Sequence, residues 1–197
     1  MGKVLIAAAV VVTAAAVVGG ARVWASQDVK TPAYQVEAAQ GAFEVRQYPA
    51  MVAAQVDRQG ARGAAVRAAF SPLAGYIFAK DRPGEKIAMT APVTQEPDDN
   101  GWTVSFIMPE GRTLADLPTP AGDVTLVDIP PRRMAAMSFS GRWTDARFQQ
   151  HSDQLLAWVT AQGLTTIGDV EFAYYNDPFT PAFMRRNEVM VEISSRQ

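Results

Sequence analysis

Two stretches of the chain carry the same landmarks at an offset of 81 residues. Phe43–Gly60 aligns with Val124–Gly141, and each stretch has an apolar strand-like run, a turn proline, a second apolar run and a closing glycine. The turn prolines are Pro49 and Pro130. A helical pattern follows each glycine, and two more strand-like runs follow each helix. Because so small a unit cannot cover both faces of its own sheet, the pattern predicts two strand–strand–helix–strand–strand halves packed around one core.

The predicted fold is therefore α+β, with halves at about residues 34–117 and 123–197. The later strands of the two halves are expected at Lys86–Val93, Trp102–Met108, Val170–Asn176 and Glu188–Ile193. Asp98–Gly101 lies between the first two of these strands and predicts a hairpin loop.

The two predicted helices differ in how clearly they are delimited. The second has Thr144 as its N-cap, Asp145 in its first turn and Gly163 after its last turn. Its apolar stripe consists of Phe148, Leu155, Leu156 and Val159. The first helix carries Val66, Phe70, Leu73 and Ile77 at helical spacing. Because proline removes a helical hydrogen bond and clashes with the preceding turn, Pro72 predicts a break or kink in this helix.

The N-terminus has the layout of a secretory signal peptide over residues 1–25. Lys3 is followed by the apolar stretch Val4–Val18, two glycines and small residues before a cleavage point at Ser26. An uncleaved anchor is the alternative, because Val4–Ala21 has 18 residues without a charge. Residues 26–33 are expected to form a tether. Either way the folded domain is exported, as a periplasmic or secreted protein or on the periplasmic side of the inner membrane.

The composition excludes several classes of site. The absence of cysteine excludes thiolate metal sites and covalent haem attachment, and a single histidine cannot supply two or three imidazoles to a metal. No phosphate-binding glycine loop and no G-x-S-x-G motif is present. A net charge of −2 does not attract nucleic acid. We therefore expect neither an enzyme nor a nucleic-acid-binding protein.

The single histidine, His151, borders the apolar face of the second helix. Imidazole is a common axial ligand of haem iron, which makes His151 a candidate metal ligand. The alternative is a half-buried histidine at the edge of the core. Thioether sulfur can also ligate haem iron, but we interpret Met89, Met108 and Met184 as packing residues.

An apolar loop beside two arginines is the best candidate for the rim of a pocket. In Phe179–Met184 two phenylalanines are held by prolines, and Arg185 and Arg186 follow directly. A flat apolar ligand with carboxylates on one edge needs an apolar slot and cations at its rim, and guanidinium pairs well with carboxylate. Other basic residues near the predicted helix and turns are Lys80, Arg82, Lys86, Arg132 and Arg133.

Four motifs, in order along the chain, resemble those of the SOUL/haem-binding protein family. They are FSPLAGYIF (Phe70–Phe78), EKIAMTAPV (Glu85–Val93), SFIMP (Ser105–Pro109) and RRNEV (Arg185–Val189). The resemblance covers a domain at residues 34–197. It implies two pseudo-symmetric halves that form a distorted β-barrel or curved sheet with both helices outside. It also implies non-covalent binding of haem or a related tetrapyrrole, with no chemistry performed by the protein and no other metal.

The resemblance also implies a set of contacts for the tetrapyrrole. An apolar wall would come from Phe70, Leu73 and Ile77, and a lid from Phe179, Phe183 and Met184. Arg185 or Arg186 would lie at the propionates. The leading prediction is thus an exported haem or porphyrin binder that buffers, scavenges or delivers its ligand.

Two alternatives remain open. The fold also resembles the effector-binding domains of drug-responsive regulators, which bind amphiphilic and often cationic small molecules. Such a pocket needs a buried carboxylate, and Glu188 and Glu192 alternate with apolar strand residues, which predicts that both face solvent. In the other alternative the domain is a membrane-tethered interaction module, attached to the membrane only through its N-terminal segment.

Overall fold

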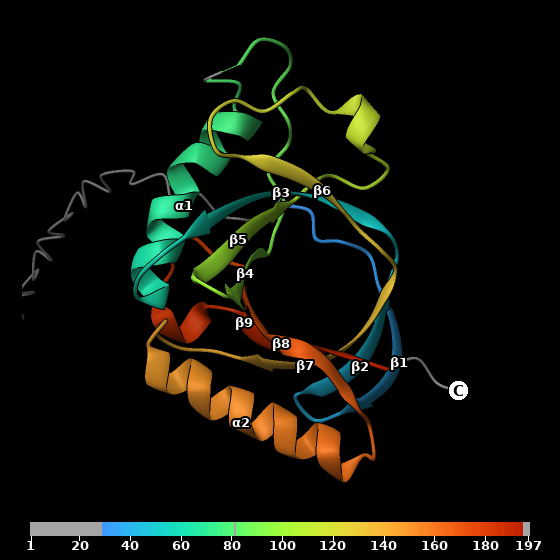
Figure 1. Cartoon of the computed structure of the whole chain (residues 1–197). Helices are drawn as coiled ribbons and strands as arrows, with labels where there is room; N and C mark the ends of the chain where they lie inside the picture. Colours follow the sequence, from blue (N-terminus) through green and yellow to red (C-terminus); the bar gives the residue numbers. More distant parts are fainter. Residues whose placement is uncertain (1–28, 81, 195–197) are drawn as a thin grey trace, which may run out of the picture.

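One curved antiparallel sheet forms the body of the domain (Figure 1). The computed structural model describes residues 29–80 and 82–194. The strands are β1 Gln35–Gln40, β2 Phe43–Tyr48, β3 Met51–Arg58, β4 Val93–Asp98, β5 Gly101–Ile107, β6 Thr125–Ile129, β7 Arg132–Phe139, β8 Thr166–Tyr174 and β9 Asn187–Ile193. The helices are α1 Arg62–Ile77 and α2 Asp145–Ala161, with short 3₁₀ turns η1 Leu114–Asp116 and η2 Ala182–Met184. The predicted N-terminal signal or anchor segment lies outside the described residues.

The strand order is β1-β2-β7-β9-β8-β4-β5-β3-β6, and the sheet stays open between its edge strands β1 and β6. After the edge strand β1, each half supplies two strands, a helix and two strands in sequence order, which confirms the predicted α+β fold. The equivalent strands β2 and β6 of the two halves each pair with a strand of the other half, β2 with β7 and β6 with β3. The halves also meet where β4 pairs with β8. The two halves are therefore interleaved in one sheet.

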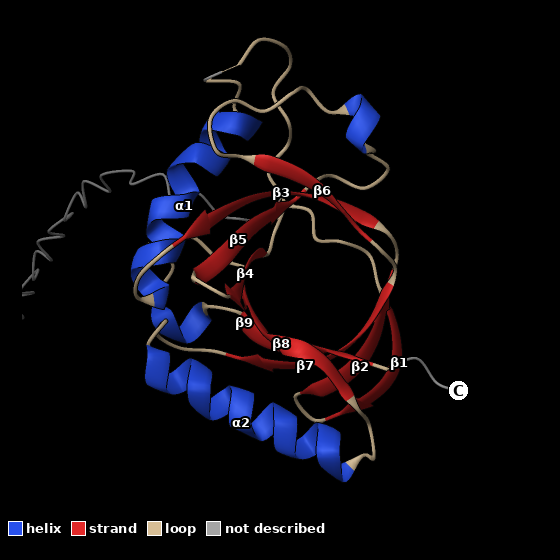
Figure 2. Ribbon diagram, in the orientation of Figure 1, coloured by secondary structure: helices blue, strands red, loops and turns tan. Residues whose placement is uncertain are grey.

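Both helices cover the outer face of the curved sheet (Figure 2). Apolar side chains from β3 and β5 pack under α1, and those from β7, β8 and β9 pack under α2. Because side chains alternate along a strand, the intervening residues of the same strands point to the inner face. The inner face therefore has its own cluster around Tyr48, Met134 and Met190, which are buried.

The second helix begins and ends where the sequence predicts. Thr144 is its N-cap, and Gly163 follows the last turn with φ +66°, a conformation that glycine adopts without strain. Of the predicted stripe, Leu156 is 37% exposed and so does not belong to the core. Ser152 takes a place on the buried face, because its hydroxyl donates to the carbonyl of Phe148 (2.9 Å) and needs no water.

The first helix continues through Pro72 over its whole length, so of the predicted break or kink the break is wrong and the kink stays a prediction. The carbonyl that loses its helical partner is that of Ala68, four residues earlier, and Ala68 is exposed. Water can therefore satisfy that oxygen, while Leu73 and Ile77 anchor the helix to the core on the opposite side.

The predicted strand at Lys86–Val93 is also wrong. Pairing begins only at Val93, where the predicted strand ends, and β4 continues to Asp98. The preceding segment packs back on the end of α1, because the amide of Ile87 donates to the carbonyl of Ile77 (2.7 Å) and Ile87 is buried. The hairpin at Asp98–Gly101 is confirmed, with β5 starting at Gly101. None of the helices in the described part of the chain is long and apolar enough to cross a membrane.

Candidate functional site

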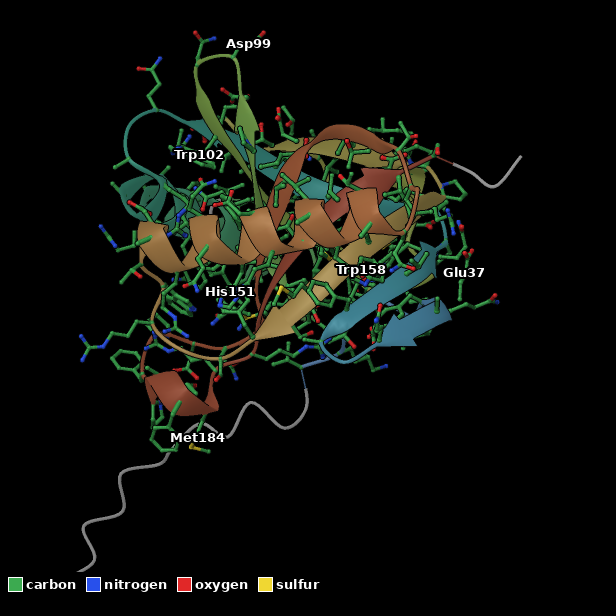
Figure 3. The ribbon with its side chains drawn as sticks, turned by 90° about the horizontal axis from the view of Figure 1, so that it is seen from below. Glu37, Asp99, Trp102, His151, Trp158 and Met184 are labelled. Carbon is green, nitrogen blue, oxygen red and sulfur yellow. The ribbon has the colours of Figure 1, made fainter. Side chains whose placement is uncertain are left out.

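The predicted lid is an exposed loop, residues 177–185, which we name the Phe179 loop. The exposed fractions are 94% for Phe179, 78% for Phe183 and 63% for Met184. These are the three highest values among the large apolar side chains that the structure describes. Figure 3 shows Met184 at the tip of a segment that projects from the body of the domain. Single exposed apolar residues are ordinary, but three neighbours on one loop make that loop the candidate contact surface.

Hydrogen bonds fix the conformation of the Phe179 loop. The Asp177 carboxylate accepts from the amides of Phe179 (2.7 Å) and Thr180 (3.0 Å) and from the Thr180 hydroxyl (3.0 Å). Desolvation by itself raises the pKa of Asp177, but these hydrogen bonds outweigh it and hold the pKa below its ordinary value. The loop therefore presents its phenylalanines without having to order first.

Arg185 ties the loop to the start of α2. Its Nε donates to the carbonyl of Thr180 (2.8 Å) and its Nη2 to that of Pro178 (2.7 Å), while the guanidinium lies 4.3 Å from the ring centre of Trp143. The indole of Trp143 donates to the side chain of buried Asn187 (2.6 Å). Trp143 is thus a half-buried aromatic residue at the edge of the core that contacts the loop through Arg185.

The structure does not bring the predicted apolar wall to the loop. Leu73 and Ile77 are buried between α1 and the sheet, and Phe70 is 42% exposed with its ring edge-on to Phe106. The contacts around the loop involve the first residue of α1, because Arg62 donates to the carbonyl of Trp143 (3.1 Å). Leu73 lies eleven residues further along the helix, roughly 16 Å at 1.5 Å per residue.

Arg186 belongs to a buried charge network. It donates to Glu188 (2.8 Å), stacks on Tyr175 at 3.9 Å and is 43% exposed. Arg46 holds the same carboxylate through two hydrogen bonds of 2.7 and 2.9 Å. Burial opposes ionisation of Glu188, but pairing with Arg46 prevails and lowers its pKa to about 2. The network is satisfied within the protein.

The prediction that Glu188 faces solvent is wrong, because its side chain is 0% exposed. Its neighbours in β9, Val189 and Val191, face the helices, so Glu188 points to the inner face as the alternation requires. The sheet curls around that inner face and buries it as well. Strand alternation therefore separates two buried environments here, rather than core from water.

Other predicted basic residues serve the fold. Arg82 is buried and donates to the backbone carbonyls of Tyr76, Pro83 and Glu85, each at 2.9 Å. These hydrogen bonds fix the conformation of the segment that follows α1. Arg133 pairs with Glu37 (2.8 Å). Lys80 and Lys86 are exposed.

Comparison with known proteins identifies the domain. The family model described as SOUL heme-binding protein matches residues 29–192, which include both helices and almost the whole sheet. The chain belongs to the SOUL family. No curated protein sequence matches it.

Several solved structures share the fold of this SOUL domain. The C-terminal domain of EcmrR superposes with a TM-score of 0.60 at 14% identity, over 83% of this chain and 99% of that one. A hydrolase from Listeria innocua gives 0.52 at 16% identity, over 80% and 94% of the two chains. An uncharacterized conserved protein from Listeria innocua gives 0.54 at 15% identity, also over 80% and 94%. At these identities the likeness establishes a common fold alone.

His151 lies on α2 of the SOUL domain, well apart from Met184 in Figure 3. Its ring stacks on Phe139 with centres 3.9 Å apart, and its Nδ1 lies 3.1 Å from the side-chain oxygen of Gln154. Partial burial lowers the pKa of His151, so the imidazole is neutral at pH 7. Within residues 29–80 and 82–194, no cluster of three or more histidine or acidic side chains is arranged to hold a metal ion.

Proposed function

We propose that this chain is an exported, non-catalytic binding protein for haem or a related tetrapyrrole, and that the Phe179 loop is its contact surface. The observation that carries the proposal is the exposure of Phe179, Phe183 and Met184 on a loop already fixed by hydrogen bonds. Membership of a haem-binding family supports the ligand class. The role is buffering, scavenging or delivery in the periplasm or outside the cell.

The loop has the chemistry that a tetrapyrrole needs. Its two exposed phenylalanine rings and Met184 offer an apolar surface to the porphyrin face, and thioether and aromatic groups pack well against such a ring system. Arg185 ends the loop and Arg186 follows it, and a planar guanidinium is suited to a propionate. Trp143 lies below the loop, where a bound tetrapyrrole would quench its fluorescence.

Export is supported by the sequence before residue 26. A basic residue, an uncharged apolar stretch and small residues before Ser26 together form a signal peptide or, if uncleaved, a membrane anchor. Either form would carry the domain across the inner membrane, and the absence of cysteine is compatible with an oxidising compartment.

A haemin titration tests the proposal, followed by Soret absorption and tryptophan fluorescence. Replacing Phe179 and Phe183 by serine removes two apolar contacts worth about 1.5–3 kcal/mol each when buried, so haemin affinity should fall at least tenfold. The matched control is Ile167→Ser, which removes a 50% exposed apolar residue from β8 and should leave affinity unchanged.

The two tryptophans on or near α2 locate the bound haemin. Trp143 lies under the Phe179 loop, whereas Trp158 stacks on Phe43 (5.1 Å) near the other end of the helix (Figure 3). Haemin on the loop should quench Trp143 in a Trp158→Phe variant more strongly than Trp158 in a Trp143→Phe variant. Non-saturating association of the wild type would refute haem binding. Saturable binding that survives the double serine replacement would move the site away from the loop.

A further inference from the structure

The Phe179 loop lies at one end of the domain together with the segment that leads into α2. The amide of Gly141 donates to the carbonyl of Ala182 in the loop (2.9 Å), and Arg62 of α1 donates to the carbonyl of Trp143 (3.1 Å). We name the loop, residues 140–147 and Arg62 together the loop end. Its apolar tip projects from the body of the domain (Figure 3). Such a tip can enter the interface of a lipid bilayer without any movement of the rest of the domain.

The loop end is positively charged, although the whole chain has a net charge of −2. It contains two aspartates and four arginines, which give it a net charge of +2: Asp145, Asp177, Arg62, Arg142, Arg147 and Arg185. Asp145 is paired with Arg62 (2.7 Å), and the Asp177 carboxylate accepts hydrogen bonds within the loop. The guanidinium charge at this end therefore exceeds the carboxylate charge.

Two exposed arginines stand beside the apolar tip. Arg142 follows Gly141, which contacts the loop, and Arg147 donates through Nη2 to the carbonyl of Ser140 (2.8 Å). Both arginines are exposed, and neither forms an ion pair with another residue of the described ranges 29–80 and 82–194. Guanidinium groups in this position can pair with the phosphates of a bilayer that the tip enters.

The opposite end of the domain has the opposite charge. Strand β4 starts at Val93, which pairs with the last residue of β8 near the loop, and leads to the β4–β5 hairpin. Residues 96–101 of that hairpin contain three carboxylates and no basic residue. Figure 3 shows Asp99 and Met184 on opposite sides of the domain. A negatively charged surface therefore attracts the loop end and repels the hairpin, which orients the domain with its loop end towards that surface.

The first described residues also lie near the loop end. Lys30 forms a bridge with Thr90, and its carbonyl accepts from the amide of Ala91 (2.9 Å), just before β4 begins. In the anchored form of the chain, eight residues lead from Ala21 to Val29, and they span at most about 30 Å. An uncleaved anchor would thus keep the loop end close to the bilayer.

We propose that the loop end docks on an anionic lipid bilayer. The three exposed apolar side chains of the Phe179 loop enter the interfacial region, and Arg142 and Arg147 meet the lipid phosphates. Binding of this kind grows with the apolar area buried and with the attraction to anionic lipid, and the loop end supplies both. Haem is itself an amphiphile that partitions into bilayers, so the docked loop takes up or releases it there; this last step rests on the proposed function.

A single fluorescent label tests the docking, because the chain has no cysteine of its own. Met184→Cys in one variant and Asn100→Cys in another carry the environment-sensitive dye NBD on the purified full chain. The vesicles contain phosphatidylcholine and phosphatidylglycerol, with a nitroxide on the lipid acyl chain as quencher. The dye at position 184 should shift to the blue and be quenched, whereas the dye at position 100, in the exposed hairpin, should not respond. No quenching at position 184, or equal quenching at both positions, would overturn the proposal.

Replacing Phe179 and Phe183 by serine in the Met184→Cys chain tests the apolar contacts. The ratio of inserted to undocked loop, measured from the quenching, should fall at least tenfold. The matched control is Val36→Ser with Ile167→Ser, which removes two apolar residues that are each 50% exposed on β1 and β8. This control should insert as the wild type does. Equal losses in the two double variants would refute insertion through the loop.

Arg142→Gln with Arg147→Gln tests the charge. A basic residue near an anionic surface contributes roughly fivefold to the affinity, so the ratio of inserted to undocked loop should fall at least tenfold in the vesicles with phosphatidylglycerol. In vesicles of phosphatidylcholine alone, the double variant and the wild type should respond equally. Insertion of the wild type that does not depend on phosphatidylglycerol would refute the choice of an anionic bilayer.

A haemin titration without vesicles separates this proposal from the proposed function. Arg142→Gln with Arg147→Gln should leave haemin affinity unchanged, because neither arginine belongs to the Phe179 loop. Tight haemin binding by a chain whose loop shows no quenching would overturn the docking alone. Quenching at position 184 in a chain that does not bind haemin would confirm the docking and refute the haem function.

Discussion

Neutralising Glu188 should destabilise the domain and remove much of its sensitivity to acid. The carboxylate is fully buried and accepts hydrogen bonds from Arg46, Ser138, Tyr175 and Arg186. Glu188→Gln keeps the shape of the side chain but leaves Arg46, which is 2% exposed, with Glu44 as its remaining carboxylate partner (2.6 Å). Removing one member of a buried ion pair costs about 3–5 kcal/mol.

The pKa gives an independent estimate of the same interaction. Pairing lowers the pKa of Glu188 from 4.5 to about 2, and one pKa unit corresponds to about 1.4 kcal/mol, so ionisation in the folded state contributes about 3 kcal/mol. Because the folded-state pKa is the lower one, this stabilisation is fully present above about pH 5. It is lost as the pH falls towards 2.

Urea denaturation followed by tryptophan fluorescence at pH 7 and pH 3 measures both effects. Wild type should lose a large part of this stabilisation between the two values, and Glu188→Gln should be less stable at pH 7 and less dependent on pH. Glu85→Gln is the control, because Glu85 pairs with Arg112 at the surface and such pairs are worth about 0–1 kcal/mol. A Glu188→Gln variant within about 1 kcal/mol of wild type at pH 7, with the same pH dependence, would refute the reasoning.

Two further replacements probe the core and the histidine. Phe148→Ala should cost about 3–5 kcal/mol in urea denaturation, because this fully buried ring contacts Phe139, Phe172 and Tyr174; a cost below about 1 kcal/mol would contradict that packing. His151→Ala should leave the Soret maximum and the haemin affinity unchanged, since the ring is stacked on Phe139 and its Nδ1 lies beside the side chain of Gln154. A displaced Soret band in that variant would instead make His151 an axial ligand.

Much of the fold could be predicted from the sequence because the landmarks that define it are local. Thr144 and Gly163 delimit α2, and Asp98–Gly101 forms the expected hairpin. The errors arose where tertiary contacts override local preference. Pro72 is tolerated because Ala68 faces water, and the segment before Val93 follows the end of α1 instead of pairing. Strand β1 has no apolar alternation because all six of its residues are exposed at the sheet edge, so no signal marked it.

The candidate sites were only partly predictable for a related reason. The Phe179 loop can be recognised in the sequence by its two phenylalanines among prolines. The residues of the inner face cannot be recognised in this way, because Arg132 and Glu171 lie in different strands of the second half and resemble ordinary surface charges in sequence. One signal was present: Arg46 in β2 and Glu188 in β9 have opposite charges at positions that both face away from the helices. Without knowing that the sheet curls over that face, such charges are read as solvent-exposed.

The pairing of β2 and β6 with strands of the other half bears on how the chain can be divided. Six residue pairs join β2 to β7 and five join β3 to β6, so each half completes the sheet of the other. A cut in the connection between Leu117 and Val124 would separate three strand pairs, β2 with β7, β3 with β6 and β4 with β8, so each fragment would have three strands that lack a neighbour. Such fragments should be unable to fold alone and should regain the native structure on mixing, which makes the connection a natural place to split the protein into complementing parts.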